Sequence, residues 1–330
     1  MADKNPWSSD AYFASSASRK RAGISDFAYD DDVRSGRASD IHETLDPKKM
    51  RDGIRESRDS DENPESLPIA VLFDVTGSMG NIPVTFQGKL PNLMDVILAK
   101  AQIKYPHILV GAIGDATCDR FPFQVGQFES DNRFDEQLRN IILEGGGGGQ
   151  DLESYGLAFR FAAYHTATDS FEKRGKKGYV FTIGDERPWP VVSAEEVRKV
   201  FGVQADADES VEDLIAKASE KWELFHIFPQ NAQHGRSTSI QNRWRELLGE
   251  RFVMLEDESL VCEVIAGFVY SLETAYGVDR VVDDLGLKGD ARTMVTNALV
   301  PFVSNRLPGN VSIGSLPAAH RKSSGGVTRF

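Results

Sequence analysis

The sequence predicts an α/β protein with a Rossmann-like, mostly parallel central sheet and helices on both of its faces. Three observations lead to this prediction. Short, nearly continuous apolar runs are typical of strands that are buried on both faces. Segments with helical spacing of their apolar residues alternate with these runs. Three of the apolar runs end in an aspartate, namely Asp74, Asp115 and Asp185.

Five buried strands are predicted, together with one shorter run that alternates like an edge strand. The buried strands are LPIAVLFD (67–74), HILVGAIGD (107–115), GYVFTIGD (178–185), WELFHIFP (222–229) and RFVMLED (251–257), and the edge strand is FPFQVGQF (121–128). Helices are predicted over 90–101, 134–143, 152–164, 211–221, 241–248 and 258–276. Because ligands of such sheets bind beyond the carboxyl ends of the strands, the loops after Phe73, Ile113 and Ile183 should converge.

The two ends of the chain differ from this α/β region, which spans 67–276. Residues 1–66 are polar and poor in aliphatic side chains, so we expect an extended or disordered arm. The aromatic residues of the arm could anchor it on its own domain or on a partner. Residues 277–304 have a helical pattern, and residues 305–330 form a Gly/Ser/Pro-rich basic segment that we expect to be a flexible tail.

Composition narrows the class of protein. The net charge of −12 argues against a nucleic-acid partner, whose phosphates attract basic patches. No apolar run approaches the roughly 18 to 20 residues of a membrane span, and the N-terminus lacks the pattern of a secretory signal. The two cysteines, Cys118 and Cys262, have neither disulfide-framework nor metal-site spacing. We therefore expect a cytoplasmic protein that binds neither membrane nor nucleic acid.

The loop after the first strand carries oxygen ligands on alternate residues. Asp74, Thr76 and Ser78 place a carboxylate and two hydroxyls on one tight turn. Such oxygens can face one hard cation, and Mg²⁺ keeps several waters, so few protein ligands suffice. Asp185 ends another central strand and could hold a coordinated water. The pattern predicts a divalent metal site at this edge of the sheet.

The segment VLFDVTGSMG resembles the first metal loop of von Willebrand factor A-like (vWA) domains, which follow the pattern Asp-x-Ser/Thr-x-Ser. The resemblance covers about 67–275 and implies the vWA fold, whose mostly parallel sheet has one antiparallel edge strand. It also implies a metal ion-dependent adhesion site (MIDAS), with Asp74, Thr76 and Ser78 from the first loop and Asp185 from the third. The implied metal is Mg²⁺, or Mn²⁺ or Ca²⁺ in its place.

The second metal loop departs from the adhesion pattern. The family has a Thr after a Gly-Gly pair, whereas this chain has GGGGGQDLES, which resembles a GGG-D-x-x-E variant of intracellular members. We expect Asp151 to supply the missing oxygen, with Gln150 and Glu153 as alternatives. Asp115 is expected to orient water or a hydroxyl behind the metal. Arg187 and Trp189 are candidate docking residues on the rim, although local packing explains Trp189 equally well.

The resemblance implies a non-enzymatic module that binds a protein partner through its metal. The partner would offer an Asp or Glu to an open coordination position, and an AAA+ ATPase or a multiprotein assembly is implied by the family. One alternative is a metal-independent scaffold or virion-type structural protein on the same fold. A second is a phosphatase-like hydrolase with Asp74 as nucleophile, but such enzymes prefer Asp at the position of Thr76. A phosphate-binding loop is disfavoured because Gln150 and Asp151 follow the glycines.

Overall fold

The computed structural model describes residues 7–146 and 149–304. Its centre is a six-stranded sheet with the order β12-β11-β7-β2-β3-β4. The strands are β2 (Leu67–Asp74), β3 (Pro106–Ile113), β4 (Phe123–Val125), β7 (Gly178–Ile183), β11 (Trp222–Pro229) and β12 (Phe252–Leu255). Only β4 among these strands runs antiparallel to its neighbour, and the others pair in parallel. The predicted sheet and its antiparallel edge strand are therefore confirmed, and the strand order is that of the Rossmann type.

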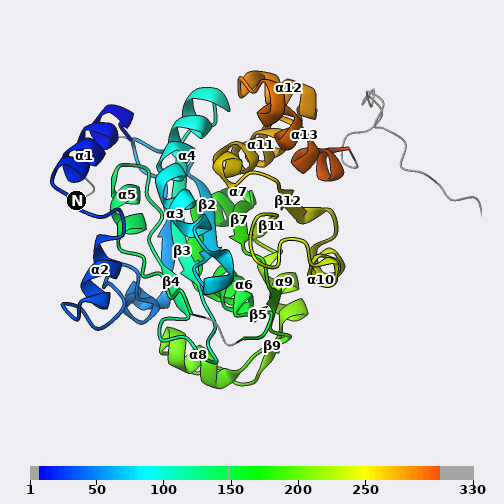
Figure 1. Cartoon of the computed structure of the whole chain (residues 1–330). Coiled ribbons are helices and arrows are strands. Elements are labelled where there is room, and N and C mark those ends of the chain that lie inside the picture. Colours follow the sequence, from blue (N-terminus) through cyan, green and yellow to red (C-terminus); the bar gives the residue numbers. More distant parts are fainter. Residues whose placement is uncertain (1–6, 147–148, 305–330) are drawn as a thin grey trace, which may run out of the picture.

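Helices cover both faces of the sheet, as Figure 1 shows. One core contains side chains of α3 (Ile82–Lys89), α4 (Pro91–Asp95), α5 (Arg133–Arg139), α11 (Val261–Thr274), α12 (Val278–Asp284) and α13 (Gly289–Val303). The other contains side chains of α6 (Tyr155–Tyr164), α8 (Ala194–Phe201), α9 (Val211–Ala218) and α10 (Thr238–Leu248). Along β2, Ile69 and Val71 enter the first core and Ala70 and Leu72 the second. This alternation explains why the strand is apolar throughout.

Within residues 7–146 and 149–304, three two-stranded pairings lie outside the central sheet. They join β1 (Arg55–Ser57) to β6 (Thr166–Thr168), β5 (Leu152–Glu153) to β8 (Arg187–Pro188), and β9 (Val191–Val192) to β10 (Glu209–Ser210). The short helix α7 (Asp169–Arg174) follows β6. The remaining helical turns are η1 (Pro47–Lys49), η2 (Arg51–Gly53), η3 (Gly77–Met79), the π-helical η4 (Val96–Lys100), η5 (Gly249–Arg251) and η6 (Glu258–Leu260).

The structure changes one predicted helix in a way that matters for the site. The apolar spacing of 152–164 predicts one helix, but α6 begins only at Tyr155. Leu152 and Glu153 instead form β5, because the amides of Arg187 and Trp189 donate to the carbonyls of Asp151 and Glu153, both at 3.0 Å. A long-range pairing therefore overrides the local helical pattern.

The N-terminal arm contains helices and lies against the domain where the structure describes it. Its helices are α1 (Ser9–Arg21) and α2 (Ala28–Arg34), drawn in dark blue in Figure 1. The Trp7 indole N–H donates to Asp95 Oδ1 at 2.6 Å, and Phe27 enters the core that α11 lines. The amide of Val125 in β4 donates to the carbonyl of Leu45 at 2.8 Å. Trp7 and Phe27 thus anchor the arm on its own domain, whereas Tyr29 bonds within the arm and Phe13 is exposed.

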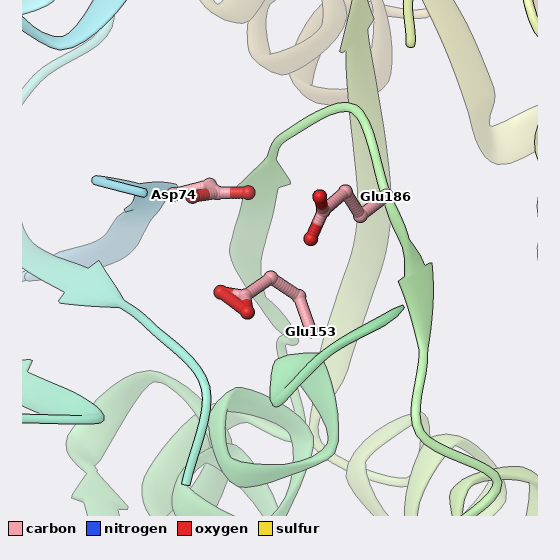
Figure 2. Close-up of side chains that lie close together, drawn as sticks. All are labelled: Asp74, Glu153 and Glu186. Carbon is pink, nitrogen blue, oxygen red and sulfur yellow. The ribbon is translucent and has the colours of Figure 1, made fainter. Parts of the chain in front are cut away.

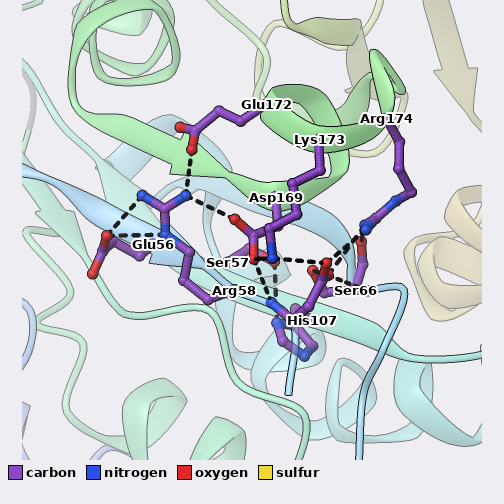
Figure 3. Close-up of polar contacts among 10 residues, drawn as sticks. Glu56, Ser57, Arg58, Ser66, His107, Asp169, Glu172, Lys173 and Arg174 are labelled. Atoms are coloured by element: carbon purple, nitrogen blue, oxygen red, sulfur yellow. Dashed lines mark hydrogen bonds and ion pairs between the residues drawn. The ribbon is translucent and has the colours of Figure 1, made fainter. Parts of the chain in front are cut away.

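A polar network ties the end of the arm to α7 (Figure 3). Asp59 accepts hydrogen bonds from Arg174 at 2.7 Å and from the Ser66 hydroxyl at 2.8 Å. Arg58 donates to Asp169 at 3.0 Å and also pairs with Glu172. These contacts hold the chain that enters β2 beside the chain that enters β7.

The C-terminal part agrees in outline with the helical pattern of 277–304, where α12 and α13 pack on α11. The expected flexible tail, 305–330, lies outside the described residues. Among the described helices, none combines the length and the apolar character that a membrane crossing requires.

Candidate metal site

The loops after β2 and β7 meet at the carboxyl ends of the parallel strands. Asp74 is the last residue of β2, and Asp185 follows β7 by two residues. Both side chains are fully buried. Because β2 and β7 are hydrogen-bonded neighbours with Phe73 opposite Ile183, the two aspartates are brought together by the sheet register. This is the convergence that the strand ends predict.

The first loop folds around the Asp74 carboxylate. Asp74 Oδ1 accepts from the Thr76 amide at 2.8 Å and from the Thr76 hydroxyl at 2.6 Å. The Ser78 hydroxyl donates to Asp185 Oδ1 at 2.7 Å and lies 3.4 Å from the Thr76 hydroxyl. The four side chains therefore form one connected group of oxygens.

Glycines bring a second segment against this loop. The Gly77 amide donates to the Gly146 carbonyl at 2.6 Å, and the Gly145 amide donates to the Val75 carbonyl at 3.1 Å. A Cβ on Gly77 would lie only 2.9 Å from the Gly146 oxygen. Gly145 has a φ of +62°, which favours glycine. Part of the glycine run therefore lets two backbones approach closely; residues 147–148 of that run lie outside the described part of the chain.

Three buried carboxylates converge beside the loop. Asp74, Glu153 and Glu186 each place a ligand oxygen within 4.8 Å of the other two (Figure 2). The pairing of β5 with β8 explains this, because it sets Glu153 opposite Pro188 and so brings the strand that carries Glu153 close to Glu186. Glu153 is 2% exposed, and its Oε2 has no hydrogen-bond partner among the residues that the structure describes. An unpartnered buried carboxylate oxygen is costly in a protein interior unless something positive satisfies it.

The electrostatics of the cluster follow from burial and from its like charges. Burial and then the charge of Asp185 raise the pKa of Asp74 to about 7, although hydrogen bonds from Thr76 oppose the rise. Burial, Asp74 and Asp185 raise the pKa of Glu186 to about 9. Burial, Asp74 and Glu186 raise the pKa of Glu153 to about 12. Such a set holds protons at neutral pH unless a cation replaces them.

The donor set fits a hard divalent cation. It offers carboxylate and hydroxyl oxygens, the ligands that Mg²⁺, Mn²⁺ and Ca²⁺ prefer. The Glu153 carboxyl group, one of whose oxygens has no partner among the described residues, lies in the same cluster as Asp74. A bound cation would supply positive charge to all three carboxylates and polarise any further oxygen ligand that joined it.

A buried aromatic cluster of Tyr155, His226 and Trp244 lies next to Asp74. The Tyr155 hydroxyl donates to Asp74 Oδ2 at 2.9 Å, and the Tyr155 ring packs edge-on against His226 and Trp244. A Cβ on Gly184 would lie 1.8 Å from the Tyr155 hydroxyl, so only glycine fits there. His226 is buried and bonds the Thr182 hydroxyl at 2.9 Å and the Gly184 carbonyl at 3.1 Å.

The other residues singled out from the sequence surround this cluster. Asp151 forms two hydrogen bonds with Arg187, at 2.5 and 2.6 Å, and both side chains are about one-third exposed. Asp115 is buried and accepts from Gln150 at 2.7 Å and from the Trp189 indole at 3.1 Å. Asp115, Gln150 and Trp189 thus form a group of their own, held by hydrogen bonds.

Three residues of the site have no place in the sequence prediction. Glu186 directly follows Asp185, and the acidic Gly-Asp-Glu turn after a buried strand could have indicated it. Tyr155 and His234 carry no sequence signal, because distant segments bring them to the site. The His234 amide donates to Asp185 Oδ2 at 2.7 Å, and its ring nitrogen lies 3.5 Å from Glu186.

A pocket of about 700 Å³ lies against the metal loop. Its lining includes Ser78, Glu186 and His234, and also the exposed glycines 77, 145 and 146. The lining is polar, and it exposes the Ser78 side of the loop while Asp74 stays buried beneath. A ligand in this pocket would therefore meet the hydroxyl side of the loop first.

The strand order, the antiparallel β4 and the position of the Asp-x-Thr-x-Ser loop define a vWA-like α/β fold. No family model matches the chain, and no curated protein matches its sequence.

Similar chains exist among solved structures. One is the pilus adhesin SpaC from Lactobacillus rhamnosus GG, with a TM-score of 0.44, 9% identity and coverage of 70% of this chain. Another is proximal thread matrix protein 1 from the mussel byssus, with a TM-score of 0.41, 11% identity and coverage of 63% of this chain; one of its structures has a zinc-occupied MIDAS motif. The match spans only 31% of the adhesin and 48% of the matrix protein.

Proposed function

We propose that this chain is a protein-interaction module that binds its partner through a divalent metal ion. The observation that carries the proposal is the convergence of Asp74, Glu153 and Glu186 within 4.8 Å, with one Glu153 oxygen buried and without a partner in the described part of the chain. Three buried carboxylates without a cation among them are a costly arrangement, and their pKa values are all raised. A cation removes that cost, so its binding is favoured over an empty cluster.

In this proposal the first loop contributes Asp74, Thr76 and Ser78, and the third loop contributes Asp185. Thr76 and Ser78 offer hydroxyl oxygens on the pocket side, and Asp74 and Asp185 lie behind them. For the second loop, the contacts favour Glu153 over Asp151 as the ligand, because Asp151 is already paired with Arg187. Asp151 and Gln150 then belong to the rim. The preferred ions are Mg²⁺, Mn²⁺ or Ca²⁺, which take oxygen ligands.

A partner carboxylate is the ligand that best suits this pocket. The pocket is open on the side of Ser78, where a metal could take a further oxygen. We propose that an Asp or Glu of a protein partner fills that position, and that the partner is an AAA+ ATPase or a component of a cytoplasmic assembly. Arg187 and Trp189, on the segment that follows Glu186, would add contacts at the rim.

A hydrolytic role is disfavoured by the position of Asp74. A nucleophilic carboxylate must reach the substrate, but Asp74 is fully buried and accepts from Thr76 through one oxygen and from Tyr155 through the other. The described residues that line the pocket include no lysine to bind a phosphate.

A metal-independent scaffold remains the second candidate, and one observation favours it. The Thr76 and Ser78 hydroxyls already have acceptors in Asp74 and Asp185, so the first loop is satisfied without a cation. The scaffold would then use the fold alone for assembly contacts.

Capture of binding partners in Mg²⁺ or in chelator separates the two candidates. Immobilised wild type would be compared with Ser78→Ala and with Ser239→Ala, a control on α10 whose hydroxyl bonds that of Ser237 at 3.1 Å. Metal-dependent docking predicts partners that wild type and Ser239→Ala retain in Mg²⁺ and lose in chelator, and that Ser78→Ala does not retain. Partners that bind equally to all three proteins in chelator would support the scaffold instead.

A further inference from the structure

Two side chains of helix α2, in the N-terminal arm, hydrogen-bond to the amide and the carbonyl of Leu143. The Leu143 amide donates to Asp30 Oδ1 at 3.1 Å, and Arg34 donates to the Leu143 carbonyl at 2.7 Å. Arg34 and Asp30 also pair with each other at 2.6 Å. Two side chains one helical turn apart thus take the donor and the acceptor of a single residue that is 109 positions or more away in sequence.

These contacts differ from a second ion pair of the arm, which joins Asp32 of α2 to Arg37 beyond the end of the helix. The Asp30 side chain is 7% exposed and that of Arg34 is 56% exposed. Asp32 and Arg37, which pair at 2.6 Å, are 43% and 65% exposed, so the two pairs differ mainly in the burial of the carboxylate. The Asp32 carboxylate has Arg37 as its hydrogen-bond partner and Arg37 has Asp32, both within the arm. Exposed pairs contribute little free energy, while a buried carboxylate that accepts a backbone amide contributes more.

Leu143 lies just before the two glycines that hydrogen-bond to the metal loop, residues 74–78. Two residues later, the Gly145 amide donates to the carbonyl of Val75, and the Gly146 carbonyl accepts from the amide of Gly77. Val75 and Gly77 flank Thr76, and Gly77 precedes Ser78. The Arg34 guanidinium lies 3.7 Å from where a Cβ on Gly145 would be, so it sits against this segment as well.

We propose that Asp30 and Arg34 are positioning residues for the metal loop, acting through the segment from Leu143 to Gly146. By fixing Leu143, they hold Gly145 and Gly146 in hydrogen-bonding register with the loop and keep the Thr76 and Ser78 hydroxyls in place. The arm is then part of the metal site although it supplies no ligand. This inference rests on the proposed function, because it assumes that the loop binds a cation.

The test compares Mn²⁺ binding by the full chain in four forms, wild type and three variants. The Asp30→Ala/Arg34→Ala double variant removes both contacts to Leu143, and Asp32→Ala/Arg37→Ala removes the neighbouring exposed pair as a matched control. Removing residues that orient metal ligands typically weakens affinity by about 10- to 100-fold. We expect a dissociation constant at least about tenfold higher for the first variant and unchanged for the control. Asp30→Asn, which keeps the acceptor for the Leu143 amide, should recover part of the affinity.

Hydrogen exchange of the metal-free proteins provides a readout that general destabilisation does not reproduce. The Asp30→Ala/Arg34→Ala variant should exchange faster at Gly145 and Gly77, with β7 and α11 unchanged, and the control should match wild type throughout. Equal Mn²⁺ affinity in wild type and this variant would overturn the inference and leave the metal site standing. Absence of Mn²⁺ binding in wild type would instead overturn the proposed function and the inference together.

Discussion

Glu153→Gln should change stability and metal affinity in opposite directions. Glu153 lies in the cluster with Asp74 and Glu186, and none of the described residues hydrogen-bonds to its Oε2. Glutamine keeps the size of the side chain but removes one acidic group from three that repel one another. The metal-free variant should therefore be more stable than wild type, while its affinity for Mg²⁺ or Mn²⁺ should fall. Such a trade between stability and function is common at binding sites.

The size of the stability gain follows from the pKa of Glu153. Its pKa is about 12 in the folded protein, against an ordinary value of 4.5. At pH 7 the folded metal-free protein must therefore keep a proton that the unfolded chain releases, which costs about 3 kcal/mol at roughly 1.4 kcal/mol per pH unit. Burial of the glutamine amide offsets part of this gain in stability. We therefore expect Glu153→Gln to raise the free energy of unfolding by about 1 to 3 kcal/mol. Because the pKa of Glu153 is raised on folding, the wild-type protein loses stability as the pH rises above the ordinary value of 4.5. The stability advantage of Glu153→Gln over wild type should therefore grow between pH 5 and 8.

Urea unfolding of the chelated proteins at pH 5, 7 and 8 measures this gain. Glu195→Gln, at a position on α8 where the side chain is 83% exposed, serves as control and should stay within about 0.5 kcal/mol of wild type. Calorimetric titration of the same proteins should show metal affinity lower by about tenfold or more for Glu153→Gln. A destabilised Glu153→Gln, or a gain that is independent of pH, would refute the reasoning about the carboxylate cluster.

Three further predictions concern the support of the site and the charges around it. Gly184→Ala should cost about 2 to 3 kcal/mol in urea unfolding, because its Cβ would collide with the buried Tyr155 hydroxyl, and a wild-type midpoint would contradict this packing. Asp59→Asn should cost about 2 kcal/mol at pH 7, since Arg174 and Ser66 hold the pKa of Asp59 well below its ordinary 3.8. That stability is present above pH 3.8 and is lost as pH falls below it, so urea unfolding at pH 3 should show a smaller deficit, and an equal deficit at both pH values would argue against the ion pair. Mn²⁺ binding at pH 7 should release protons from the three buried carboxyls, which calorimetry in buffers of different ionisation enthalpy detects; heats that do not depend on the buffer would contradict the raised pKa values.

The sequence was sufficient for the parts of the site that follow buried strands. Asp74 and Asp185 each come after a continuous apolar run, and the parallel register of β2 and β7 then brings them together. Thr76 and Ser78 follow Asp74 at the spacing of a metal loop. Local pattern and sheet topology agree here, so the sequence-based prediction of the fold is reliable at these positions.

The conformation around Glu153 is set by pairing with a distant segment, which the local sequence pattern does not predict. The apolar spacing of 152–164 favours a helix, whereas Glu153 belongs to a two-residue strand that exists only because residues 187–189 bind it. The same pairing takes Asp151 toward Arg187. No periodicity within either segment contains this information, since the two segments are more than 30 residues apart.

The docking of the N-terminal arm also could not be predicted from its composition. Its composition predicts an extended chain, because polar sequences bury little apolar surface. In the described part, a few anchors suffice for docking: Trp7 bonds Asp95, Phe27 enters the core, and Asp30 takes the amide of Leu143. A small number of specific contacts thus compensates for a low apolar content, and composition does not report such contacts.

Calorimetric titration of Mg²⁺ and Mn²⁺ into the chelated full chain tests the central claim most directly. Wild type would be compared with Asp74→Asn, which removes the charge of the first-loop carboxylate, and with Asp151→Asn, which removes a carboxylate that is paired with Arg187. The account predicts saturable binding to wild type and to Asp151→Asn, and none to a folded Asp74→Asn. Absence of binding to wild type, or equal binding to wild type and Asp74→Asn, would contradict a metal site built on Asp74.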